Sequence, residues 1–131
     1  MSNWQKFFTI FTMIVVSSNA YAFKPSEEAQ AKDWLEMASP VMLKADACAY
    51  KNRYEMIDLI MNVAYDIVGA QDETMQSLVD MWWGLAEMQL SPKQVRGALY
   101  MKQNASNTDV KAQCAVINKQ IDGLYNKLKA E

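Results

Sequence analysis

Histidine is absent from the 131-residue sequence. Its absence excludes Ser–His and Cys–His nucleophilic catalysis, together with every zinc site that depends on an imidazole ligand. The sequence also lacks a glycine-rich phosphate loop, a dinucleotide fingerprint and a calcium-loop pattern. Two carboxylates can hydrolyse a glycosidic bond, but pairs such as Glu55 and Asp58 fall at helical spacing beside an apolar seam, where we expect them to be solvated. We therefore predict that the protein is not an enzyme and has neither catalytic residues nor a cofactor.

Glycine and proline are scarce, with four and three residues in the chain. Runs of alternating β-branched residues, which would indicate strands, are absent after residue 22. With few positions that interrupt a helix and no strand pattern, the sequence predicts an all-α fold.

Methionine, with ten residues, is abundant instead. Thioethers bind Cu(I), but such a site needs tight clustering or accompanying histidine or cysteine. The methionines after residue 22 are at least five residues apart. We interpret them as core or interface side chains and predict no metal site.

The first 22 residues are typical of an export signal. Lys6 provides a short positive region, an apolar or hydroxyl run occupies residues 7–16, and a small-x-small cleavage motif ends at Ala22. The run is shorter than the ~20 residues that a membrane-spanning helix needs. We predict a signal peptide cleaved after Ala22, a mature chain of residues 23–131 that forms one helical domain, and a periplasmic location without membrane insertion.

The charge of the mature chain narrows the class of partner. Removal of Lys6 changes the formal net charge from −2 to −3, and the basic residues are not clustered. Nucleic acid and anionic lipid are therefore poor partners on electrostatic grounds. A mildly acidic surface suits a protein partner that is basic.

The two cysteines, Cys48 and Cys114, both follow the predicted signal, so export would place them in an oxidising compartment. One intramolecular pairing is available, and it would stabilise the fold by up to roughly 4 kcal/mol in the chain-entropy model. A reactive thiol pair and an intermolecular bridge are the alternatives. We predict a structural disulfide between Cys48 and Cys114.

Capping signals divide the chain into about five helices. Ser39-Pro40 resembles an N-cap followed by proline at the first helical position, and Gly69 is suited to end a helix. Asp72 is a second N-cap, and Ser91 opens a capping box. The helix that starts at Ser39 is long, and an interruption between residues 45 and 52 is an open alternative. The expected helices span residues 26–38, 39–68, 72–89, 91–103 and 108–129.

Apolar seams at heptad spacing indicate which faces are buried. The seam of the last helix includes Cys114, and Cys48 points toward the same broad apolar side as the seam of the helix before Gly69. These positions predict a small helical bundle in which one disulfide staples two buried faces together. The two seams consist of Val110, Cys114, Ile117, Ile121, Leu124 and Leu128, and of Met56, Ile60, Val63 and Ile67.

The helix expected at residues 72–89 is apolar around most of its circumference. Its 3-4-3 seam is Met75, Leu78, Trp82 and Leu85. In the interpretation that we favour, it is the central helix of the bundle. In the other interpretation its flanks are exposed and bind a partner, since tryptophan and methionine are enriched in interface cores. A contact between two copies of the chain would satisfy both. The candidate partner-binding residues are Trp83, Met81, Met88 and Leu90.

These features favour a binding protein that neutralises another protein in the periplasm. In layout alone, the chain is similar to the helical, disulfide-containing periplasmic immunity proteins of the type VI secretion system. This resemblance implies a cell-wall-targeting toxin as the partner and assigns no residue. One alternative is a small disulfide-containing holdase chaperone, in which protonation of carboxylates exposes the methionine and tryptophan surface. Another is an accessory subunit of an envelope complex.

Overall fold

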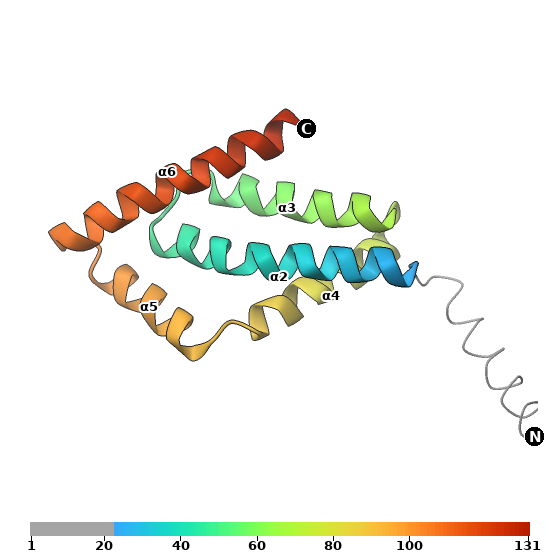
Figure 1. Cartoon of the computed structure of the whole chain (residues 1–131), viewed down its shortest axis with the longest axis horizontal. Helices are drawn as coiled ribbons and strands as arrows, with labels where there is room; N and C mark the ends of the chain where they lie inside the picture. The colour runs from blue at the N-terminus through green and yellow to red at the C-terminus, as the bar shows by residue number, and fades with distance from the viewer. Residues whose placement is uncertain (1–22) are drawn as a thin grey trace, which may run out of the picture.

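The computed structural model describes residues 23–131, which form five α-helices and no β-strand. The all-α bundle that the sequence predicts is confirmed (Figure 1). The predicted export signal at residues 1–22 lies outside the described residues. None of the described helices is both long enough and apolar enough to cross a membrane. The helices are α2 (Pro25–Ala47), α3 (Arg53–Val68), α4 (Glu73–Met88), α5 (Pro92–Gln103) and α6 (Thr108–Ala130).

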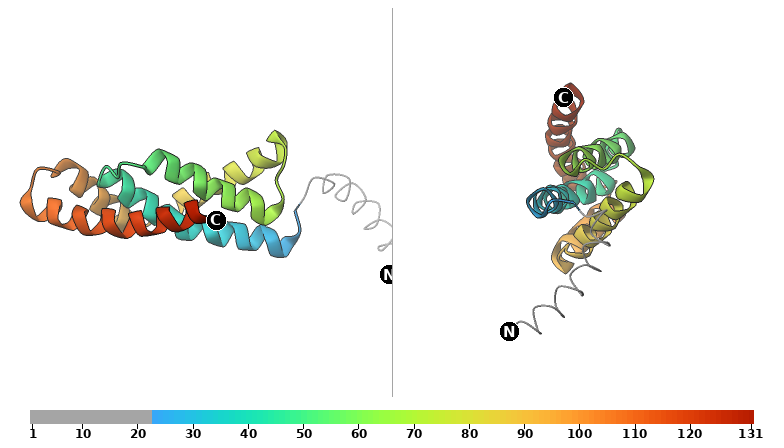
Figure 2. Two further views of the ribbon diagram at one scale, coloured as in Figure 1. Left: turned by 90° about the horizontal axis from the view of Figure 1, so that it is seen from above. Right: turned by 90° about the vertical axis from the view of Figure 1, so that its right-hand side faces the viewer.

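The central helix is α2, which contacts each of the other four helices. It lies between α3 and α6 on one side and α4 and α5 on the other (Figures 1 and 2). The expectation that the helix at residues 72–89 is central is therefore wrong. Most buried residues of α2 are alanines, including Ala31 and Ala45, which are fully buried. Small side chains let neighbouring helices approach from several directions, but they give only a weak apolar pattern in the sequence.

The predicted helix boundary at Ser39-Pro40 is also wrong, because α2 continues through Pro40. An interior proline removes one backbone hydrogen bond and costs about 3 kcal/mol. Leu35 and Ala45, on either side of Pro40, are both fully buried in the same core, and the free energy gained by their burial offsets this cost. The interruption comes instead at residues 48–52, within the alternative range, where Ala49 adopts a φ of 50°.

The capping predictions at Gly69, Asp72 and Ser91 are confirmed, whereas Ser26, the expected cap of the first helix, lies inside α2, whose N-cap is Lys24. Gly69 ends α3 in the left-handed conformation, with a φ of 69°. The Asp72 side chain accepts a hydrogen bond from the Met75 amide at 2.8 Å, and Ser91 and Gln94 form both bonds of the capping box. The N-cap of α6 is Asn107, so the helix begins at Thr108, as expected.

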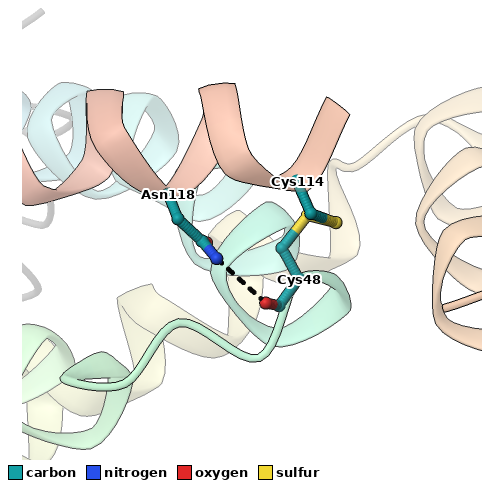
Figure 3. The surroundings of a disulfide bond; sticks show 3 residues. All are labelled: Cys48, Cys114 and Asn118. Carbon is teal, nitrogen blue, oxygen red and sulfur yellow. Dashed lines mark hydrogen bonds between the residues drawn. A yellow bond between two sulfur atoms is a disulfide. The ribbon is translucent and has the colours of Figure 1, made fainter. Parts of the chain in front are cut away.

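The disulfide between Cys48 and Cys114 is present and joins the end of α2 to α6 (Figure 3). The two Cα atoms are 5.2 Å apart. One turn further along α6, the Asn118 amide donates a hydrogen bond to the Cys48 carbonyl at 3.2 Å. Two more hydrogen bonds hold α6, from Tyr50 to Asp122 and from Tyr125 of α6 to Glu55 of α3. The bridge thus adds a covalent link to a helix that also buries Ile121 and Tyr125 in the core.

Replacement of Leu35 by alanine is expected to lower the free energy of unfolding by about 2–5 kcal/mol, because Leu35 is fully buried on the central helix. Urea unfolding followed by circular dichroism measures this change. Met37→Ala, two residues away at a side chain that is 63 % exposed, is the control and should change stability by less than about 0.5 kcal/mol. Similar losses in the two variants would contradict the placement of α2.

Candidate protein-binding surface

Helix α4 has one face in the core and one face in solvent. Val79 and Ala86 are buried against the rest of the bundle, and Trp82 and Trp83 pack partly against the same core. The predicted seam of α4 is therefore wrong in part: Met75 and Trp82 contact the core, whereas Leu78 and Leu85 lie outside it. Periodicity did not distinguish the two faces, because α4 carries apolar residues on both.

The solvent face of α4 carries four large apolar side chains at 3-4-3 spacing, which places them in one line along the helix. We call these residues the outer stripe. Their exposed fractions are substantial, from 36 % at the first to 80 % at the last. The outer stripe consists of Leu78, Met81, Leu85 and Met88.

The structure divides the four predicted partner-binding residues between two surroundings. Met81 and Met88 belong to the outer stripe and are 64 % and 80 % exposed. Trp83 and Leu90 are half-buried and line a small hollow of about 190 Å³ against α2, together with Met42. Only the two methionines are therefore available at the outer surface. The leucines of the stripe were missed because the heptad pattern assigned them to the core.

A row of small residues and a row of acidic residues run beside the outer stripe. On ideal helix geometry, Ser77 and Gly84 lie next to the methionines, and three acidic residues lie one step further around the helix. Helix α4 contains no basic residue, and the ion pairs among the described residues involve other carboxylates. The outer surface of α4 is thus apolar along its centre and acidic along one edge. The acidic row consists of Glu73, Asp80 and Glu87.

The position of α4 is fixed from two sides. Tyr65 of α3 donates a hydrogen bond to Asp80. Burial of the Tyr65 phenol, and then this hydrogen bond, raise its pKa from 10.0 to about 12. On the side of α2, the Trp82 ring packs edge-on against Phe23, with 5.3 Å between ring centroids. The outer stripe is therefore presented on an anchored helix.

The raised pKa of Tyr65 predicts a loss of stability in alkaline solution. Between pH 10 and pH 12 the unfolded chain releases the Tyr65 proton while the folded protein retains it. The stabilising contribution is therefore complete below about pH 10 and is lost as the pH rises through about 12. Urea unfolding across this range should show a smaller decrease for Tyr65→Phe than for the wild type. Tyr50, whose pKa burial also raises to about 12, is retained in both proteins. If Tyr65→Phe and the wild type lost the same stability over this pH range, the raised pKa of Tyr65 would be contradicted.

No family model, curated protein or solved structure matches this chain. The candidate site therefore rests on the geometry of the molecule itself. In the described part of the chain, no group of three or more Cys, Asp or Glu residues is arranged to hold a metal ion.

A second hollow, of about 670 Å³, lies between α2, α3 and α6, and no residue of α4 lines it. Its apolar wall includes Trp34, Val63 and Leu128, and its edge carries both Asp33 and Lys127. The Trp34 indole donates a hydrogen bond to the Ile60 carbonyl at 2.9 Å, which fixes the ring in the wall. The rim also includes Glu131, so it carries two acidic side chains and one basic side chain. The hollow between α2, α3 and α6 therefore provides a control surface for substitutions in α4.

Proposed function

We propose that the protein is an exported binding protein that neutralises another protein, and that it docks through the outer stripe of α4. The observation that carries this proposal is the exposure of four large apolar side chains on a helix whose opposite face is buried. Large exposed apolar patches mark interaction sites on soluble proteins. Methionine supports such a role, because its flexible side chain adapts to the surface of a partner.

The predicted export signal supports a partner that is met in the periplasm. The disulfide is consistent with this compartment, since such bridges form and persist in oxidising surroundings. Toxins that act on the cell wall reach their targets there, and a small stapled bundle without histidine is suited to block one rather than to degrade it. We therefore propose an immunity protein against such a toxin.

The exposed stripe favours this role over an acid-activated holdase. In a holdase of that kind, apolar surface is released when carboxylates become protonated and the bundle loosens. Here the stripe is exposed on the folded bundle, with α4 anchored to both α2 and α3. A surface that needs no activation suits a partner that is bound directly.

Toxin challenge of a deletion strain tests the proposal. Cells without the gene should lose resistance to a cell-wall-targeting toxin, and expression of the wild-type protein should restore it. Met37→Lys, in the hollow between α2, α3 and α6, should also restore resistance, whereas Met81→Lys should not. The two methionines are a matched pair, because they are 63 % and 64 % exposed. Unchanged toxin sensitivity in the deletion strain would overturn the proposal of an immunity protein.

A further inference from the structure

We infer that the segment of the partner that lies on α4 is a basic amphipathic helix. This inference rests on the proposed function, because it specifies what the outer stripe binds. An amphipathic helix buries its apolar side in a line of hydrophobic contacts at 3-4-3 spacing. The outer stripe has this spacing over three turns, from Leu78 to Met88. A single helix laid along α4 would cover all four of its side chains.

The charge of α4 determines the charge of the partner. Glu73, Asp80 and Glu87 repeat at intervals of seven residues, so they form one edge of the outer surface. None of the three forms an ion pair within the described residues, although Asp80 accepts the hydrogen bond from Tyr65 and Glu87 also lines the small hollow against α2. A partner helix with lysine or arginine beside its apolar side would place cations along this edge, which favours association and sets the orientation. A second copy of α4 packed antiparallel would instead bring two acidic edges together.

The length of α4 and the basic residues that follow it limit the length of the contact. Helix α4 has 16 residues, which correspond to about 24 Å. Beyond the turn at residues 89–91, helix α5 carries Lys93 and Arg96, which would repel a basic partner. The contact is therefore confined to α4, and about four turns of a partner helix suffice to cover it.

Gly84 gives the partner helix room to approach. It lies between the outer stripe and the acidic row, and a Cβ atom added there would meet no atom within 4 Å. Its φ is not positive, so nothing among residues 23–131 requires glycine at this position. Glycine within a helix is destabilising relative to other residues, but it lets another backbone come close. Gly123 of α6 is equally open and serves as a control.

Peptide binding to the purified exported protein tests the inference. The probes are two fluorescein-labelled 16-residue helical peptides with the same leucine stripe, flanked in one by lysine and in the other by glutamate. We expect the lysine-flanked peptide to bind at least tenfold more tightly in fluorescence anisotropy at low salt. Combined Glu73→Gln and Glu87→Gln substitutions should remove most of this preference. Equal affinities, or no binding of either peptide, would overturn the inference.

Two glycine variants test the close approach. Gly84→Gln should weaken binding of the lysine-flanked peptide about tenfold, whereas Gly123→Gln should leave it unchanged. Both variants should keep or raise the melting temperature, because glutamine is the better helix former. Unchanged binding in Gly84→Gln would contradict the approach at this position.

Two further outcomes separate this inference from the proposed function. Lost toxin resistance in the deletion strain, together with no preference between the peptides, would overturn the basic helix and leave the immunity function standing. A dimer in analytical ultracentrifugation that Met81→Lys dissociates would assign the outer stripe to a second copy of the chain, and would also overturn the basic helix.

Discussion

Joint replacement of Cys48 and Cys114 by serine is expected to lower the free energy of unfolding by about 4 kcal/mol. The bridge spans 66 positions of sequence, and its loss restores the conformational freedom of a long loop in the unfolded chain. The loss is severe relative to the 5–15 kcal/mol by which folded domains are typically stabilised. Because the bridge is the covalent link between the end of α2 and α6, we expect its loss to loosen α6 more than the other helices.

Thermal unfolding followed by circular dichroism measures the effect of the bridge, with a Tm expected to fall by roughly 15 °C or more. Reductant should lower the Tm of the wild-type protein to that of the double variant and leave the variant itself unchanged. Hydrogen exchange should be fastest in α6 of the variant. A Tm within a few degrees of the wild type would contradict the structural role of the disulfide.

Simultaneous replacement of Met81 and Leu85 by lysine is expected to abolish partner binding, with a loss of about 100-fold or more. Both side chains lie in the outer stripe and are 64 % and 51 % exposed. Their replacement places two charges in the centre of the proposed interface, where they would be desolvated. Neither change touches the buried face of α4, so the Tm should stay within a few degrees of the wild type.

The control for this double variant is Met37→Lys combined with Val116→Lys. These residues are 63 % and 58 % exposed and lie on α2 and α6, away from α4. Toxin protection in cells, and isothermal titration with the purified toxin, compare the two double variants. Full protection by the Met81 and Leu85 variant, or equal loss in the control, would show that the outer stripe is not the docking surface.

Capping chemistry made most of the helix boundaries predictable. Gly69, Asp72 and Ser91 act through their own backbone conformation or side-chain hydrogen bonds, so their effects are local and visible in sequence. Ser39-Pro40 has the same local chemistry but does not cap a helix. There, burial of residues on both sides of the proline outweighs the local signal, and burial depends on neighbours that are distant in the chain.

The central position of α2 could not be predicted from apolar periodicity. Its buried side chains are mainly alanine, and Ser39 is buried with them at 2 % exposure. Such residues contribute little apolar area, so their pattern is weak although their positions are crowded. The disulfide was more accessible to prediction, because an exported chain with two cysteines has one internal pairing.

The candidate site was predictable only in part. The alternative interpretation, in which the flanks of α4 are exposed and bind a partner, includes Met81 and Met88, and the structure places both in the outer stripe. Trp83 and Leu90 were grouped with them, but they pack beside α2 instead. A helix that is apolar on both faces does not indicate which face the bundle covers, and that choice depends on how α4 docks against α2 and α3.

Site-specific photo-crosslinking in living cells tests the central claim most directly. A photoreactive amino acid replaces Met81 in one strain and Met37 in another, so the two probes have equal exposure on different faces. We predict a crosslink at position 81 to a single protein, the toxin whose effect the deletion strain reveals, and no crosslink to that protein at position 37. Crosslinking of the toxin at position 37 but not at position 81 would contradict the account.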